Sequence, residues 1–244
     1  MTTIPRGDFL GLPLAAPTED ELIDYLLSSG PPRAAAYLNA HVVNLAFESR
    51  DAARLLRAMD LVYADGMSVV REARRAGLRV PERLSAADYL LRVAWRASAQ
   101  GKRVALVGGA PGVAERCAKA LRREVPGLQV CATAHGYFKD SGAERLGARV
   151  ASARPDLVLL GMGTPRQERV ALAWRAQGVA PVLWCVGALF EYYAGTMPRA
   201  PRWMSANGFE WLFRLGAEPR RMARRYLVGN PLFLWRARRG RPAP

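Results

Sequence analysis

Short apolar runs alternate with longer amphipathic stretches along most of the chain. Six largely apolar runs predict buried strands at residues 34–38, 61–63, 103–107, 128–133, 157–160 and 182–186. The intervening stretches carry apolar residues at helical spacing and predict helices at 40–59, 67–76, 85–99, 113–124, 141–153 and 165–177. Thr18 and Glu21 form a capping box that predicts one further helix, which stops at Gly30. Apolar strands that alternate with helices form parallel sheets covered on both sides. The sequence therefore predicts an α/β fold with a mainly parallel, Rossmann-like sheet and helices on both faces.

Polar residues and glycines follow nearly every predicted strand. Asn39 follows the first strand, Asp65 the second and Gly187 the last. In parallel sheets, ligands bind in the crevice beyond the carboxyl ends of the strands. The pattern therefore predicts a ligand site along that edge.

The run Gly161-Met-Gly-Thr-Pro-Arg-Gln-Glu168 gives the most specific local signal. It follows a strand and opens a helix, with Thr164 predicted as the N-cap and Pro165 as the first helical residue. Glycines let a ligand approach the backbone, and helix N-terminal N–H groups bind phosphate. The run therefore favours a phosphate or nucleotide site, although Thr164 and Gln167 also fit a plain capping box.

A second glycine run, at residues 108–112, also joins a strand to a helix and could hold another part of a nucleotide. It is neither a P-loop nor a complete G-x-G-x-x-G motif. Thr133 and Ala134 stand where a dinucleotide-binding acid would end the next strand. An NAD-type oxidoreductase is therefore a poor fit.

Asp65 is the candidate general base, because an ionised carboxylate can take a proton from a sugar hydroxyl as the oxygen attacks. Asx-turn chemistry at Asp65-Gly66 explains the same residues equally well. Asn39 could bind a ligand or cap the next helix, and capping is the default. His41 and His135 are expected to be structural.

The composition implies an anionic partner. The chain has 244 residues, half of them hydrophobic, and a formal net charge of +15. Nucleic acid, an anionic lipid surface or a phosphate-bearing substrate would suit that charge. Three widely spaced cysteines fit a reducing compartment and argue against a structural zinc. No signal peptide or run of about 18 apolar residues is recognised, so we expect a soluble or peripheral protein.

The segment from residue 196 differs from the rest, so we predict an α/β catalytic domain at 1–195 and a helical appendage at 196–244. This segment carries eleven arginines and two acids, together with seven aromatic residues. At α-helical spacing Arg214, Arg221 and Arg225 share one face, with Arg224 close by. They could bind a diphosphate or lipid headgroups, and interleaved aromatics are typical of interfacial helices. Since no D-x-D motif occurs, these cations would replace the divalent metal that many nucleotide-sugar enzymes use.

These motifs together resemble the WecG/TagA/CpsF glycosyltransferases, glycosyltransferase family 26, from about Asn39 to Asn230. The matching runs are 39–44, 61–66, 81–85, 107–113, 136–138, 161–168, 186–190, 194–195, 199–203, 210–214, 218–221 and 225–230. So many ordered blocks are far more specific than any one of them.

The resemblance implies an inverting, metal-independent transfer, with no cofactor, from a UDP-sugar to an undecaprenyl-diphosphate-linked glycan in exopolysaccharide or cell-wall polysaccharide synthesis. It further implies a bacterial enzyme that is peripheral on the cytoplasmic face of the membrane. The donor could carry N-acetylmannosamine, its uronic acid or glucose, and the oligomeric state stays open. The predicted catalytic residues are Asp65, Arg214, Arg221 and Arg224. The predicted substrate and UDP contacts are Asn39, Gly108, Gly109, Tyr137, Gly161, Gly163, Pro165, Gln167, Gly187 and Glu191.

Three positions depart from the family pattern. Tyr37 stands where relatives often carry threonine, Ala86-Ala87 replace a Gly-Thr pair, and Glu191 replaces an aspartate. These departures affect the expected sugar more than the expected reaction. The competing class is a basic, non-enzymatic nucleic-acid-binding protein, which the charge alone permits. Glycine-ended strands speak against it, because such pockets serve small ligands.

Overall fold

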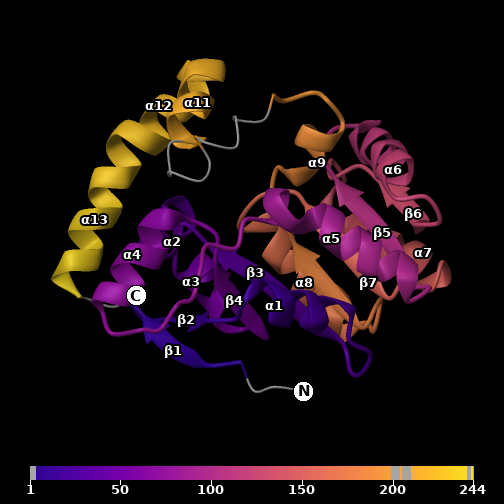
Figure 1. The fold of residues 1–244 in the computed structure, drawn as a ribbon, viewed down its shortest axis with the longest axis horizontal. Coiled ribbons are helices and arrows are strands. Elements are labelled where there is room, and N and C mark those ends of the chain that lie inside the picture. The colour runs from indigo at the N-terminus through magenta and orange to yellow at the C-terminus, as the bar shows by residue number, and fades with distance from the viewer. Residues whose placement is uncertain (1–3, 199–203, 205–209, 241–242, 244) are drawn as a thin grey trace.

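The computed structural model describes residues 4–198, 204, 210–240 and 243, which fold around one eight-stranded sheet (Figure 1). The strand order is β1-β2-β4-β3-β8-β7-β5-β6. Only β1 runs antiparallel to its neighbour, and the remaining pairs of described strands are parallel. The strands are β1 Arg6–Phe9, β2 Leu12–Ala15, β3 Arg33–Leu38, β4 Leu61–Ala64, β5 Arg103–Gly108, β6 Gln129–Ala134, β7 Leu157–Gly161 and β8 Val182–Cys185. The predicted α/β fold with a mainly parallel sheet is confirmed.

Helices cover both faces of this sheet, and each face has its own apolar core. One face carries α1 Glu19–Leu27, α5 Ala86–Ala99, α6 Val113–Glu124 and α9 Leu189–Tyr193. The other carries α2 Ala40–Glu48, α3 Arg50–Arg57, α4 Met67–Arg75, α7 Ala143–Ser152 and α8 Arg166–Ala176. A 3₁₀ turn, Asp140–Gly142, precedes α7.

Within the C-terminal segment, the described residues 210–239 are helical and lie against the α2 and α4 side of the sheet (Figure 1). It comprises α11 Glu210–Ala217, α12 Pro219–Ala223, a π-helical turn Arg224–Val228 and α13 Gly229–Arg239. Phe233 of α13 is fully buried in the core of that face. The Asn44 amide donates to the Gly229 carbonyl at 2.7 Å, and Arg236 donates to Asn44 Oδ1 at 2.8 Å. Thus α13 is tied to α2, and a boundary near residue 195 stays a prediction.

The described helices differ from the predicted ones at a few ends. Residues 40–59 form two helices, because the Ser49 hydroxyl accepts the Ala52 N–H and starts α3. Ser85 precedes α5, but its side chain makes no capping bond. The capping box of Thr18 and Glu21 is confirmed. Nothing in the apolar pattern predicted the β1–β2 hairpin, whose strands have four residues each.

No helix within the described residues is both long and apolar enough to cross a bilayer.

Candidate functional site

The carboxyl ends of the parallel strands meet along one edge of the sheet, and three cavities lie in a row there. The sheet order places Asp65 after β4, Asn39 after β3, Gly187 after β8, the 161–163 turn at the end of β7 and Gly109 after β5. We name the cavities the arginine groove, the tyrosine pocket and the glycine cleft. The predicted ligand edge is therefore hollowed along its length.

The glycine cleft has a volume of about 530 Å³. Its shape depends on close backbone approach: a Cβ on Gly108, whose φ is +154°, would lie 2.2 Å from the Gly161 carbonyl oxygen. The Gly109 N–H donates to that oxygen at 2.9 Å, and the Gly136 N–H donates to the Gly109 carbonyl at 2.8 Å. The cleft is lined by Gly109, Gly136, Tyr137, Phe138, Lys139, Gly161, Met162, Gly163, Arg166, Gly187, Ala188 and Glu191.

Two cations line the glycine cleft, Lys139 and Arg166. The Arg166 guanidinium donates to the Phe138 carbonyl oxygen, lies 4.8 Å from the centre of the Phe138 ring and is 3.6 Å from the Asp140 carboxylate. The Tyr137 ring is 76% exposed at the same cavity. The cleft thus offers backbone, positive charge and an exposed aromatic face to one ligand.

The start of α8 differs from the prediction. Helix α8 begins at Arg166 with Pro165 in the N-cap position, so the assignment of Thr164 as N-cap and Pro165 as first helical residue is wrong. The cause lies in Thr164, whose hydroxyl donates to Glu168 Oε1 at 2.8 Å and caps no backbone N–H. Gln167 N–H bonds the Gly163 carbonyl at 3.0 Å, so the turn before α8 is still closed.

Gln167 and Glu168 lie beneath the cleft, and both are fully buried. Gln167 Oε1 accepts the Gly187 N–H at 2.9 Å, while its Nε2 donates to Glu168 Oε1 at 2.9 Å. Burial raises the pKa of the Glu168 carboxyl, and the bonds from Gln167 and Thr164 partly oppose that shift. Gln167 therefore supports the Gly187 loop from below and lines none of the three cavities.

The tyrosine pocket, of about 80 Å³, lies between the two larger cavities. Tyr63 forms its buried floor and accepts the Trp184 indole N–H at 2.8 Å. Burial raises the pKa of the Tyr63 hydroxyl above its usual range, so the group stays neutral. The pocket is lined by Tyr37, Asn39, Tyr63, Asp65, Ser85, Ala86, Ala87, Val186, Ala188, Leu189, Tyr192 and Arg225.

Asp65 lines both the tyrosine pocket and the arginine groove. Its backbone N–H donates to the Leu38 carbonyl at 2.8 Å, and the Asn39 amide donates to its Oδ2 at 3.3 Å. Asn39 Oδ1 also accepts the Val42 N–H at 3.1 Å, so the expected helix cap is confirmed. One asparagine therefore both starts α2 and orients the candidate base.

The arginine groove has a volume of about 500 Å³ and lies between the sheet edge and the C-terminal helices. Four arginines, Arg71, Arg83, Arg225 and Arg238, line it beside the carboxylates of Asp65 and Glu72. Its other lining residues are Asn39, Ala40, His41, Gly66, Met67, Ser68, Ser85, Trp211, Tyr226, Asn230 and Leu234. Burial, with help from the Arg225 charge, lowers the pKa of His41 from 6.5 to about 4, so this ring is neutral near pH 7.

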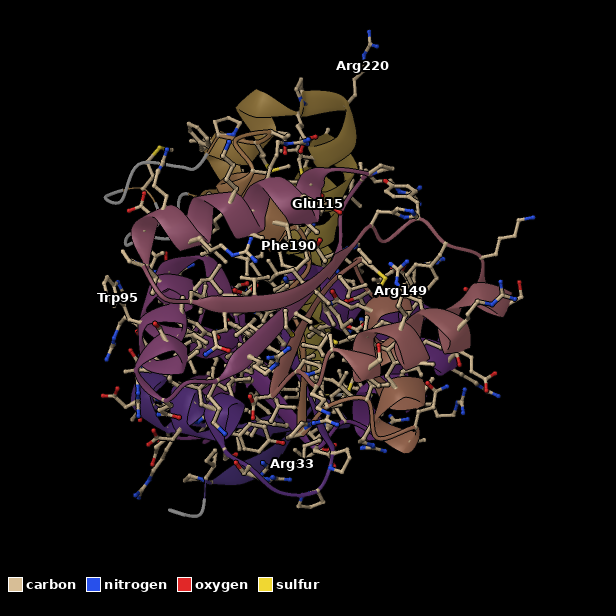
Figure 2. All side chains as sticks on the ribbon, turned by 90° about the vertical axis from the view of Figure 1, so that its right-hand side faces the viewer. Arg33, Trp95, Glu115, Arg149, Phe190 and Arg220 are labelled. Carbon is tan, nitrogen blue, oxygen red and sulfur yellow. The ribbon has the colours of Figure 1, made fainter. Side chains whose placement is uncertain are left out.

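The C-terminal arginines divide between the groove and the solvent. Arg225 lines the groove and the tyrosine pocket, whereas Arg224 is exposed and lines none of the three cavities. Arg220 projects away from the body of the protein (Figure 2). The side chains of Arg214 and Arg221 lie outside the described residues, as do Trp203, Phe209 and the 199–203 run. Their predicted roles, like that of Arg224, stay predictions.

The structure places at the cavities some residues that were not among the predicted site residues, including Arg166 and Arg225. Arg166 stood inside the quoted glycine run, where a cation at a phosphate-binding helix start was a usable signal. α-Helical spacing put Arg225 on one face with Arg214 and Arg221, but the family resemblance assigned the catalytic role to Arg224. The π-helical turn at 224–228 changes that spacing locally, and such turns are frequent at functional sites.

Most of the predicted contact residues do come together. Tyr137, Gly161, Gly163, Gly187, Glu191 and Gly109 line the glycine cleft, and Asn39 lines the other two cavities. Gly108 shapes the cleft through its contact with Gly161, and Pro165 stands at the N-cap of α8.

One comparison covers nearly the whole chain. A protein-family model described as the glycosyl transferase WecG/TagA/CpsF family matches residues 7–243.

Proposed function

The chain belongs to the WecG/TagA/CpsF family of glycosyltransferases, and we propose that it moves a sugar from a UDP-sugar to a polyprenyl-diphosphate-linked glycan. The observation that carries this proposal is the row of cavities with the Asp65 carboxylate between them. A transferase must hold two substrates on either side of one reacting centre. This edge of the sheet offers that arrangement.

The UDP moiety belongs in the glycine cleft. Glycine-lined turns let phosphate approach the backbone, and the cleft also carries Lys139 and Arg166. The exposed Tyr137 ring offers a stacking surface for a base. Because these cations can offset the charge of the leaving diphosphate, the transfer is proposed to need no divalent metal.

The acceptor belongs in the arginine groove. Its four arginines suit a diphosphate, and Trp211, Tyr226 and Leu234 give it an apolar side for the start of a lipid chain. Asp65 lies at the inner end of the groove, where an acceptor hydroxyl would meet the sugar.

In the proposed reaction, the acceptor hydroxyl oxygen attacks the anomeric carbon from the side opposite UDP. Asp65 takes the hydroxyl proton as the new glycosidic bond forms. The bond between the anomeric carbon and the phosphate oxygen breaks, and UDP leaves with the electron pair. Lys139, Arg166 and the start of α8 stabilise that negative charge. One displacement of this kind inverts the configuration at the anomeric carbon.

Membrane attachment on the cytoplasmic face is also proposed. Leu212, Leu227, Val228 and Trp235 of the C-terminal helices are each about half exposed or more. The Arg239 guanidinium lies 4.0 Å from the centre of the Trp235 ring, and exposed Arg224 is close in sequence to Leu227. Exposed apolar side chains beside cations are typical of helices that bind anionic lipid surfaces.

A donor screen tests the transferase proposal. Purified protein is incubated with a panel of UDP-sugars and synthetic polyprenyl-diphosphate glycans, and products are identified by mass spectrometry. One glycosylated lipid product with stoichiometric release of UDP supports the proposal. Transfer from other nucleotide sugars only, or onto acceptors without a diphosphate only, would contradict it.

A further inference from the structure

Tyr37 stands between the glycine cleft and Asp65. A Cβ on Gly187 would lie only 2.5 Å from the Tyr37 hydroxyl, so the phenol lies directly over this glycine. Gly187 lines the glycine cleft, Tyr37 lines the tyrosine pocket, and Ala188 lines both. The phenol therefore marks the junction between the two cavities.

The hydroxyl of Tyr37 is packed against the Gly187 turn. Gln167 supports that turn from below, because its Oε1 accepts the Gly187 N–H and its Nε2 donates to Glu168. Gln167 and Glu168 are fully buried. Burial, and then the negative charges of Glu168 and Asp65, raise the pKa of Tyr37 above its usual range, so the phenol stays neutral. A neutral hydroxyl packed against the turn in this way suits recognition of a sugar hydroxyl.

In the proposed reaction, the sugar must lie at this junction as it passes from the donor to the acceptor. Its anomeric carbon is bonded to the diphosphate in the glycine cleft and must also come within reach of an acceptor hydroxyl beside Asp65. The tyrosine pocket lies between them, with a volume of about 80 Å³ against about 530 Å³ for the cleft. Small-ligand sites usually have several hundred Å³, so this pocket is a tight subsite.

We propose that Tyr37 determines the donor sugar, accepting an unsubstituted neutral hexose and excluding N-acetylated hexosamines. The phenol occupies space at the junction that an acetamido group would need, while a sugar hydroxyl can hydrogen-bond to it. A uronic acid is disfavoured too, because its carboxylate would approach Asp65 in the same pocket. This inference deepens the proposed function and depends on it.

Calorimetry with intact donors tests the inference without any acceptor. UDP, UDP-glucose, UDP-galactose, UDP-N-acetylglucosamine and UDP-N-acetylmannosamine are titrated into the wild type, Tyr37→Thr and Tyr37→Phe. The wild type should bind at least one hexosyl donor on the order of tenfold or more tightly than either N-acetylated donor. Tyr37→Thr, which opens the junction, should reduce that preference at least threefold. Tyr37→Phe, which keeps the ring, should retain the exclusion but weaken binding of the preferred donor.

The outcomes separate this inference from the proposed function. Equal preference in the wild type and Tyr37→Thr, with UDP bound by both, overturns the role of Tyr37 alone. No binding of UDP to any folded protein overturns both proposals. Tyr25→Phe is the matched control, because Tyr25 is a buried tyrosine of α1 that lines none of the three cavities. Among the described residues its hydroxyl has no hydrogen-bond partner. A change of donor preference in Tyr25→Phe would also contradict a specific role for Tyr37 in donor selection.

Discussion

The glycine cleft and the arginine groove lie at the same edge of the sheet but are built differently. The cleft depends on backbone turns that approach too closely for side chains, as at Gly108 and Gly161. The groove depends on long side chains from α4, the loop after it, the π-helical turn and α13, among them Arg71, Arg83, Arg225 and Arg238. Substitutions in the cleft turns should therefore lower stability, whereas substitutions in the groove should lower activity and leave the fold intact.

Asp65 lies where the two regions meet, and its loss should have the largest effect on activity. Asp65→Asn keeps the size of the side chain but removes the proton acceptor, so turnover should fall about 10³-fold, or about 4 kcal/mol in barrier. Steady-state rates with the donor found in the screen measure this. Asp20→Asn is the control, since Asp20 lies on α1 and pairs with Arg92 and Arg96. Near-normal turnover of Asp65→Asn would refute the base assignment.

Gly187 tests the claim that backbone approach shapes the cleft. Its φ is +61°, and an added Cβ meets the Tyr37 hydroxyl, so Gly187→Ala should lower the free energy of unfolding by about 2–3 kcal/mol. Urea denaturation gives this value. The double variant Gly187→Ala/Tyr37→Phe should recover about 1 kcal/mol, because only the clash and not the backbone strain is relieved. If the double variant recovers nothing, the Tyr37–Gly187 contact is not as described.

Arg225 and Arg224 give the sharpest comparison within the C-terminal helices. Arg225→Ala should lower kcat/KM about 30-fold, or about 2 kcal/mol, because Arg225 lines both the groove and the tyrosine pocket. The fold reduction in kcat/KM caused by Arg224→Ala should be at least five times smaller than the reduction caused by Arg225→Ala. The reverse order would favour Arg224 as the catalytic arginine. Unchanged urea midpoints in both variants would separate the effect from stability.

The smallest expected effect is a pH dependence of stability that comes from His41. Its folded pKa of about 4 lies below the usual 6.5, so the unfolded chain binds the proton more tightly. The contribution of the neutral His41 ring to the free energy of unfolding is fully present above pH 6.5, and it is lost as the pH falls toward 4. Between pH 6.5 and 4, the free energy of unfolding of His41→Gln should therefore fall by about 1 kcal/mol less than that of the wild type. This figure allows for the partial exposure of the ring. His135→Gln, at an exposed position, should follow the wild type in the same urea titrations.

The two regions also differ in how far the sequence predicted them. Glycines at strand ends have a local meaning, because a tight strand-to-helix turn needs them. Most glycines of the cleft were therefore predicted, whereas Lys139 and Arg166 were not. The groove is assembled by α13, which packs on α2 through contacts between residues far apart in sequence, such as Asn44 and Gly229. No local pattern brings Arg71 and Arg238 to the same groove.

One local error has an equally physical cause. Threonine is a favoured residue type at an N-cap, but the Thr164 hydroxyl donates a hydrogen bond to the buried Glu168 carboxylate instead of capping the helix. At the next arginine pair, Arg225 lines two of the cavities and Arg224 lines none of them, and the role of Arg224 stays a prediction. At Thr164 a tertiary environment overrides a local preference.

Titration of UDP into the wild type, Asp65→Asn and Arg166→Ala tests the central claim most directly. If the glycine cleft holds the nucleotide and Asp65 acts only on the acceptor, the wild type and Asp65→Asn will bind UDP with the same affinity. Arg166→Ala will bind it about tenfold more weakly, a loss of about 1.4 kcal/mol. Absence of UDP binding to the folded wild type, or equal binding by all three proteins, would contradict the account.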